Sequence, residues 1–508
     1  MRTEPEITVD APSRSDTFVR GLSEVAGGPL GTHAVRRSAG SGALGTGRFW
    51  TAARVVLALA CLTMVLHWAQ KSPCETGAWP NFKQYKQFCY TDVLALYYAE
   101  KLNEGAVPYR DHPVEYPVLT GAFMGALGLP IHAFAADRPE INQGMWFYRA
   151  NAVVLGALAI ATTAFILALR RRRPWDAAMF ALAPGLFVSA TVNWDLLAIG
   201  LAAAGLYLWA RRQPVAAGVL LGLGTAAKLW PGFIFVPLLF LCLRARRGWE
   251  WIAAVTAGLA TWIMVNIPAV LANQKNWGRF IELNTERGID WGTLWYIGDH
   301  FPRGGGEYGL GWFRWLGQHV DPTLNRLTYA LIIVGWLAIG ALILFAKRRP
   351  RLAQVAFLTI AVFLIFNKVW SQQFVLWLIP LAVLARPRWG AFLVWQVAEV
   401  GYFLAFYGEL MGASGKQVFP EGVFVLASVL RLTTLAVLCG FVVRDILRPS
   451  GDAVRQTYED DPDGGILDGA RDAPWLSRLR GQPEHERAVD LVARDAQLLD
   501  RGVGRALP

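Results

Sequence analysis

The sequence predicts an all-α protein that crosses a membrane many times. Of its 508 residues, 54% are hydrophobic and 17% are charged, whereas charged residues make up about 25% of a typical soluble domain. The formal net charge of +11 comes from short basic clusters between long apolar runs. This arrangement is typical of cytoplasmic membrane loops and not of a nucleic-acid-binding surface. The composition excludes a cytosolic enzyme, a disulfide scaffold and a disordered chain, and we expect no nucleic acid as a partner.

The chain opens with a polar arm. Residues 1–48 are rich in Gly, Ser and Arg and contain no apolar run, so we expect a disordered cytoplasmic arm. A membrane-spanning helix needs about 17–25 apolar residues. The first such runs occupy 51–69, 116–136 and 145–169. The arginines of the arm predict that the first of these helices leads outward.

The run at 116–136 is expected to lie on the outer surface. Four arginines, 170–173, follow the run at 145–169. If both runs crossed, these arginines would lie outside and every later basic loop would be inverted. The charge pattern therefore predicts an interfacial helix at 116–136. Pro117 and Pro130 agree with this placement.

The remaining spans follow by alternation. The total is about twelve, with both termini cytoplasmic. The segment 214–243 could instead form a re-entrant hairpin, because Lys228, Trp230 and Pro231 interrupt it. The transmembrane domain should cover 49–445. The expected later spans are 176–191, 193–210, 214–227, 229–243, 251–271, 327–346, 352–366, 373–385, 389–407 and 421–443.

Two outer loops, 70–145 and 272–326, are too long for simple connectors. The first contains a candidate helix at 91–104, and the second contains Trp residues among Gly and charged residues. The charged cytoplasmic tail, 446–508, is expected to be a weakly ordered regulatory or tethering segment. A stretch within it, 475–499, could form an amphipathic helix.

The cysteines allow one disulfide. Cys74 and Cys89 share the first outer loop, in an oxidising compartment, so a bond between them is possible. The other cysteines lie in apolar runs and are expected to be packing residues. No metal-ligand spacing occurs in the chain, and we expect no metal site.

Ionisable residues at or inside a membrane are costly and are candidates for function. Asp92 opens an apolar-rich helix in the first outer loop, where it could be a general base or an N-cap. Lys228 lies in an apolar run and could bind a phosphate or snorkel to the surface. Arg431 lies in the last helix and could pair with Glu399 or bind a lipid phosphate.

Further candidates lie in short outer segments. The segment 108–117 could bind a sugar or an acceptor through hydrogen bonds, or it could simply form a turn. The turn 193–195 offers Asp195, which we expect to cap a helix. The turn 367–373 carries a dense polar set. The substrate-binding candidates are Tyr90, Asp111, His112, Glu115, Tyr116, Lys368, Trp370, Gln372 and Gln373.

Four motifs carry a family resemblance. They are Tyr90-Thr91-Asp92-Val93 with Tyr97, Gly105 to Tyr109 leading into Glu115-Tyr116-Pro117, Ala227-Lys228-Leu229-Trp230-Pro231, and Trp370-Ser371-Gln372-Gln373 before a helix with Pro380. In this order, over roughly 50–445, they resemble the GT-C glycosyltransferases. The specific likeness is to glycosyltransferase family 87, the polyprenol-phosphate-mannose-dependent mannosyltransferases of actinobacteria. Two departures stand out: the usual Tyr-Pro-Pro reads Tyr116-Pro117-Val118, and Gln372 and Gln373 stand where related chains often carry His.

The resemblance implies a GT-C fold with juxtamembrane helices in the first outer loop. It also implies transfer of a sugar, most readily mannose, from a polyprenyl-phosphate donor to a hydroxyl of a cell-envelope lipid or glycan. Asp92 would accept the proton, and Lys228, then Arg431, would hold the leaving phosphate. The reaction would invert the configuration at C1 of the sugar and would need no cofactor. It would occur at the outer face of the plasma membrane, with membrane lipids as partners of the protein.

Three alternatives stay open at this point. An arabinosyl or glucosyl donor would fit the same fold. A lipid-linked-sugar transporter or flippase would usually show internal repeats with paired broken helices, which the sequence lacks. A catalytically inactive scaffold for envelope assembly is the third alternative.

Overall fold

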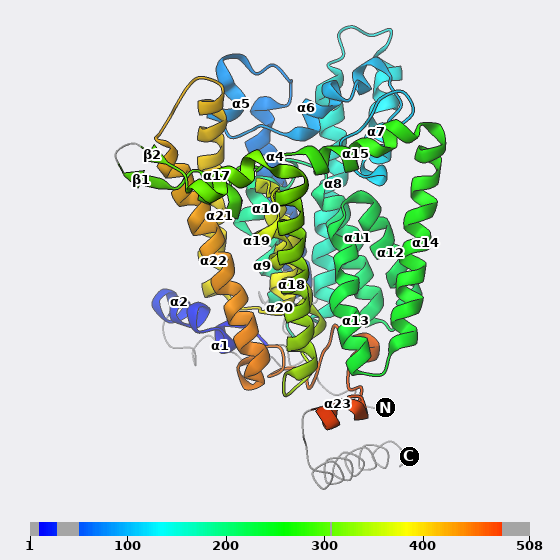
Figure 1. The fold of residues 1–508 in the computed structure, drawn as a ribbon, viewed down its shortest axis with the longest axis vertical. Helices are drawn as coiled ribbons and strands as arrows, with labels where there is room; N and C mark the ends of the chain where they lie inside the picture. The colour runs from blue at the N-terminus through cyan, green and yellow to red at the C-terminus, as the bar shows by residue number, and fades with distance from the viewer. Residues whose placement is uncertain (1–9, 28–49, 305–306, 480–508) are drawn as a thin grey trace.

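The computed structural model describes residues 10–27, 50–304 and 307–479, and its helices form an upright bundle (Figure 1). Among the described residues, seven helices are long and apolar enough to cross a membrane. They are α4 (Ala52–Lys71), α7 (Val118–Ala135), α8 (Gln143–Leu169), α14 (Gly248–Ala272), α18 (Asn325–Phe345), α21 (Trp389–Ala413) and α22 (Glu421–Leu447).

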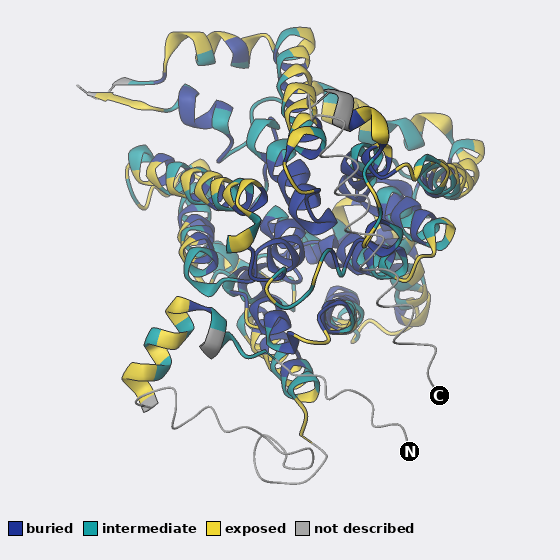
Figure 2. Cartoon of the chain, turned by 90° about the horizontal axis from the view of Figure 1, so that it is seen from below, coloured by how far each residue is buried: buried dark blue, intermediate teal, exposed yellow. Residues whose placement is uncertain are grey.

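Shorter apolar helices fill the middle of the bundle. Every residue of α20 and most residues of α19 are buried, and seen along the bundle the buried residues occupy the centre (Figure 2). These two helices are apolar on all sides because protein surrounds them. The shorter helices are α11 (Asp195–Ala210), α12 (Pro214–Ala227), η5 (Trp230–Ile234) with α13 (Phe235–Arg244), α19 (Leu352–Phe366), and η7 (Gln372–Phe374) with α20 (Val375–Ala385).

Glycines bring α12 and α14 into direct backbone contact. A Cβ atom on Gly218 would lie 2.1 Å from the carbonyl oxygen of Ala254, and one on Gly222 would lie 2.4 Å from that of Gly258. Small residues spaced four apart allow such close packing between membrane helices. This contact positions the end of α12, where Lys228 lies.

The predicted span 176–191 is wrong as a continuous helix. The segment forms η4 (Pro174–Ala177), α9 (Ala178–Ala181) and α10 (Pro184–Ser189). Pro184 lacks a backbone N–H and excludes the preceding residue from the helical region, and Ala183 is extended. The segment is almost wholly buried, which explains why its composition resembled a span.

The length and composition of α7 would allow it to cross a membrane, and its interfacial position stays a prediction. Its first turn donates a hydrogen bond from the Thr120 hydroxyl to the Ala227 carbonyl at the end of α12. Its last turns lie against Gly105 of the first outer loop. Asn142, which caps the start of α8, donates from its side chain to the Thr76 carbonyl of that same loop. Both ends of α7 thus lie on the side of the molecule that carries the loop.

The outer loops contain their own short elements. The predicted helix 91–104 is shorter than expected and ends at Ala99. In the first loop the structure has η1 (Ser72–Cys74), η2 (Pro80–Phe82), α5 (Lys83–Lys86), α6 (Asp92–Ala99) and η3 (Leu102–Glu104). The second loop has α15 (Gln274–Glu286), α16 (Leu294–Asp299), the antiparallel strands β1 (Pro302–Gly304) and β2 (Glu307–Tyr308), α17 (Gly311–Gln318) and η6 (Val320–Leu324).

The N-terminal arm is not disordered throughout. Residues 10–27 contain α1 (Pro12–Ser15) and α2 (Thr17–Gly27). The Asp16 carboxylate accepts hydrogen bonds from the backbone N–H groups of Phe18 and, at 2.8 Å, of Trp389. Asp16 therefore caps α2 and ties it to α21. The rest of the arm, 1–9 and 28–48, lies outside the described residues.

The tail is also more ordered than expected up to residue 479. It contains η8 (Pro449–Gly451), η9 (Gly465–Leu467) and α23 (Pro474–Leu479). Asp452 and Asp463 are buried in ion pairs with Arg351 and Arg170. Most of the candidate helix 475–499 falls beyond the described residues.

Candidate functional site

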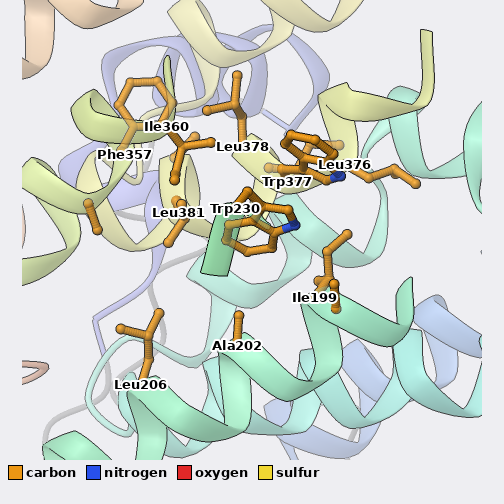
Figure 3. Close-up of a cluster of buried hydrophobic side chains, with 14 of the residues drawn as sticks. Ile199, Ala202, Leu206, Trp230, Phe357, Ile360, Leu376, Trp377, Leu378 and Leu381 are labelled. Carbon is orange, nitrogen blue, oxygen red and sulfur yellow. The ribbon is translucent and has the colours of Figure 1, made fainter. Parts of the chain in front are cut away.

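A cavity of about 710 Å³ opens at the end of the bundle that carries the outer loops. Its walls come from the first loop, from the end of α12 with η5, from α15, from the turn before α20, and from α21. Its floor includes Trp230 and Trp377, whose stacked rings lie 5.9 Å apart between their centroids. Figure 3 shows these two rings among the side chains of the buried apolar core. The floor separates the polar cavity from that core.

Asp92 lies on the wall of this cavity at the first position of α6. The capping role belongs to its neighbour, because the Thr91 hydroxyl accepts from the Val93 N–H. The Asp92 backbone N–H donates to the Val192 carbonyl at 2.7 Å. The carboxylate is therefore free for other partners. It accepts a 2.8 Å hydrogen bond from the Asn193 side chain, and another from the Tyr90 hydroxyl.

The surroundings of Asp92 adjust its acidity. Burial raises the pKa of the Asp92 carboxyl, against the opposing effects of the Asn193 and Tyr90 hydrogen bonds and the Lys228 charge. A carboxylate with a raised pKa is a better proton acceptor near neutral pH. Asp92 has the position and acidity of a general base, but the same features would also suit a buried structural carboxylate.

Asn193 holds this group in place, and the sequence analysis missed it. Its side-chain nitrogen donates to both Asp92 and, at 2.6 Å, the Tyr116 hydroxyl. Its oxygen accepts from the Trp194 N–H at 2.7 Å, which fixes the orientation of the amide. The sequence of the turn 193–195 predicts only a capping role for it. Asp195, expected there as a cap, instead forms an ion pair.

Lys228 reaches the cavity from the end of α12. Its backbone is extended, so the helix stops there and the side chain turns toward the first loop. The ammonium lies 3.3 Å from Asp195 Oδ1 and 4.9 Å from the centroid of the Tyr116 ring. Trp377 donates to the same Asp195 oxygen. Lys228 is thus paired on one side while it lines the cavity on the other.

Arg431 does not line the cavity, so its expected contact with a donor phosphate gains no support. It is fully buried, and its Nε lies 2.9 Å from Glu399 Oε2. Its other nitrogens donate to the carbonyls of Trp370 and Ser371. Its guanidinium carbon lies 4.1 Å from the centroid of the Trp370 ring. Arg431 therefore holds the turn that leads to Gln372, and the structural alternative of pairing with Glu399 is the one observed.

The other candidates divide into two groups. Five line the cavity: Tyr90, Glu115, Tyr116, Gln372 and Gln373. Four are not among its lining residues: Asp111, His112, Lys368 and Trp370. Gln372 donates to the Tyr407 hydroxyl at 3.3 Å, and its side-chain oxygen has no protein partner.

The residues outside the cavity have structural partners. Asp111 pairs with Arg110 and accepts from the Val107 N–H, as expected for a turn. His112 Nδ1 lies 3.2 Å from Glu100. Lys368 donates to the Thr285 carbonyl at 3.1 Å. Burial lowers the pKa of the Lys368 ammonium to about 8.

The second loop contributes a cation that the sequence analysis also missed. Arg287 directly follows α15, lines the cavity, and lies 3.0 Å from Asp290 Oδ2. The Asp290 N–H donates to the Lys368 carbonyl. Lys368 thereby bonds to both ends of the segment 285–290. Among the residues that line the cavity, Arg287 is the second cation besides Lys228. Nothing in the local sequence distinguishes it from the other charged residues of the loop.

A disulfide fixes the segment that precedes Asp92. Cys74 and Cys89 are bonded to each other in the structure, and Tyr90 follows at once. Arg149 of α8 pairs with Glu75 beside the bond. Among the described residues, no group of three His, Cys, Asp or Glu side chains could hold a metal ion.

Residues 121–371 match the model of glycosyltransferase family 87. The match begins within α7 and ends at Ser371, so it includes Lys228 and Arg287, whereas Asp92 precedes it. No curated protein matches the chain. The family match confirms the family that the short motifs indicated.

Proposed function

We propose that this chain, a membrane glycosyltransferase of family 87, moves a sugar from a polyprenyl-phosphate donor to a hydroxyl acceptor. One observation carries the proposal: Asp92, a carboxylate, and Lys228, an ammonium, line the same cavity. A transferase of this type needs a base for the acceptor and a cation for the departing phosphate, and this cavity offers both.

The donor half of the reaction requires positive charge. When the C1–O bond to the phosphate breaks, the electron pair leaves with the phosphate oxygen, which gains negative charge. Phosphate is a good leaving group, so cations suffice and no general acid is needed. Lys228 and Arg287 are the cations among the residues that line the cavity. Arg287 replaces Arg431 in this role.

The acceptor half requires a base. As the acceptor oxygen forms its bond to C1, its proton passes to the Asp92 carboxylate. Asn193 and Tyr90 keep that carboxylate oriented toward the cavity. Attack from the side opposite the phosphate inverts C1, so a β-linked donor gives an α-linked product. Gln372, Gln373 and Tyr116 are proposed to contact the sugars.

We further propose mannose as the sugar and a cell-envelope lipid or glycan as the acceptor. This part rests on the family resemblance of the motifs and not on the geometry of the cavity. The site would face the outside of the plasma membrane, as the charge pattern predicts.

The test uses purified protein in lipid nanodiscs with radiolabelled polyprenyl-phosphate-mannose and an actinobacterial lipid extract. Asp92→Asn keeps the size of the side chain and one acceptor oxygen but cannot accept the proton. We expect transfer to fall about 10²–10⁴-fold, the usual contribution of general-base catalysis, while donor binding stays close to that of the wild type.

The matched control is Asp111→Asn, a carboxylate of the same loop that is not among the residues lining the cavity. It should transfer at the wild-type rate. Equal transfer by Asp92→Asn and wild type would remove Asp92 as the base. Donor movement across the bilayer without any transfer would favour a flippase, and transfer of arabinose or glucose alone would correct the donor.

A further inference from the structure

The helix α2 (Thr17–Gly27) presents an apolar face that the rest of the chain leaves exposed. Phe18, Leu22 and Val25 are spaced by four and three residues, so they lie on one side of the helix. Their exposed fractions are 47%, 59% and 88%. Arg20 and Glu24 lie on the other side. An amphipathic helix of this kind needs an apolar environment for one face and water for the other.

The position of α2 indicates what covers this face. Figure 1 shows α2 at the side of the bundle near the lower ends of α21 and α22, lying across the bundle instead of along it. Viewed from below, it projects from the periphery (Figure 2). Asp10, which precedes α2, pairs with Arg173 next to the C-terminal tail. The tail packs at the end of the bundle opposite the cavity, so α2 lies at that end too.

The start of α2 is tied to the end of a membrane-spanning helix. The Asp16 carboxylate accepts from the N–H of Trp389, the first residue of α21. Tryptophan is enriched at the boundary between hydrocarbon and water. A helix that leaves the bundle sideways at this level lies in the interfacial region of the bilayer.

The apolar face of α2 also continues a surface that meets lipid. Phe18 Cβ lies 3.7 Å from the position that a Cβ on Gly390 would occupy. Val394 and Val397 follow Gly390 on the same side of α21, and they are 60% and 68% exposed. In a membrane-spanning helix such residues face hydrocarbon. Phe18 therefore lies at the foot of a lipid-facing stripe.

We propose that α2 is an interfacial anchor whose Phe18, Leu22 and Val25 insert into the membrane leaflet opposite the cavity. Arg20 and Glu24 nearly cancel in charge, so apolar burial and not attraction to anionic lipid supplies the affinity. The proposal does not depend on the transferase reaction. Its occupant is a lipid surface, not a second protein.

The test places a fluorophore on either face of α2 in the full-length protein. Cys61, Cys242 and Cys439 are replaced by Ala, which leaves the disulfide intact. An environment-sensitive dye is attached at Leu22→Cys or, as the matched control, at Glu24→Cys. The protein is placed in phosphatidylglycerol–phosphatidylethanolamine nanodiscs with or without brominated acyl chains. We expect blue-shifted emission and loss of intensity with brominated lipid at position 22, and neither at position 24.

A second pair of variants tests the apolar face itself. With the dye at Val25→Cys, Leu22→Asp should abolish the quenching, whereas Ser23→Asp on the polar side should preserve it. Aqueous emission at position 22 would overturn the proposal. Blue-shifted emission that brominated lipid does not quench would also overturn it, because a protein surface would then cover the face.

Discussion

At the scale of single residues, Asn193 controls how Asp92 works. Its amide donates to the carboxylate and thereby favours the charged form, which lowers the pKa of Asp92. Asn193→Ala removes that hydrogen bond, so the pKa of Asp92 should rise further. A general base acts only when it is deprotonated. As the pH is lowered, the variant should therefore lose its activity at a higher pH than the wild type does.

The measurement is kcat/KM against pH over about pH 5 to 9, where the acid limb reports the free enzyme's base. Asn193→Ala should move this limb to higher pH and regain much of its rate at alkaline pH. Asn276→Ala is the control and should leave the limb in place, because the half-buried Asn276 bonds to the Arg110 carbonyl and is not among the residues lining the cavity. An unshifted limb in Asn193→Ala would mean that another group titrates.

The sequence could indicate some residues of the site but not their partners. Asp92 and Lys228 stood out because a charge beside apolar runs is costly, and both line the cavity. The same reasoning selected Arg431, but the buried charge of Arg431 is compensated by an ion pair with Glu399 of another helix. Arg287 did not stand out, because a charged residue in a loop is ordinary until tertiary structure turns it toward a cavity.

At the scale of elements, α15 forms a wall of the cavity, and Arg287 directly follows it. Phe280 and Leu283 line the cavity from the same helix, which has no fully buried residue. If Arg287 holds the donor phosphate, Arg287→Ala should raise the KM for the donor about tenfold or more. A hydrogen bond to a charged group contributes about 1.5–3 kcal/mol, and about 1.4 kcal/mol is tenfold in affinity.

Arg279→Ala provides the comparison on α15, because Arg279 is not among the lining residues. It pairs with Glu282 at 3.0 Å and lies 4.0 Å from Glu286. The Arg279→Ala variant should leave the donor KM unchanged. The acid limb of Arg287→Ala should match the wild type, since Asp92 keeps its hydrogen bonds. An unaltered donor KM in Arg287→Ala would restrict the phosphate site to Lys228.

Element boundaries could be predicted where a long apolar run ends in charge. The expected spans 352–366 and 214–227 coincide with α19 and α12. The failure at 176–191 arose because Pro184 divides a buried segment whose composition equals that of a span. The helix α2 was missed because an eleven-residue amphipathic segment has low average hydropathy and reveals itself only by its period.

At the scale of the whole molecule, the two ends of the bundle differ in kind. The cavity occupies one end. At the other end, arginines that the sequence offered as topology signals are neutralised by aspartates of the tail. Arg170 pairs with Asp463, and Arg351 pairs with Asp452. These pairs could not be predicted from the sequence, because each joins residues about a hundred or more positions apart. The described part of the tail thus belongs to the folded domain.

This ionic end should determine stability without affecting catalysis directly. The side chains of Arg351 and Asp452 are 0% and 2% exposed, and Arg351 Nε lies 2.8 Å from Asp452 Oδ2. Asp452→Ala removes the nearer carboxylate from a buried guanidinium and leaves the more distant Asp463, whose Oδ2 lies 3.9 Å from Arg351. Breaking a buried pair in this way costs about 3–5 kcal/mol, so the melting temperature of the detergent-solubilised protein should fall clearly.

The exposed pair of Arg279 and Glu282 gives the matched control, because its side chains are 39% and 57% exposed. Glu282→Ala should cost only about 0–1 kcal/mol. Combining Arg351→Met with Asp452→Ala should lose less stability than the two single changes added together, since the pair is then removed as a unit. If Asp452→Ala melts with the wild type, the tail contributes nothing to the fold. The docking of 448–479 onto the bundle would then need another cause.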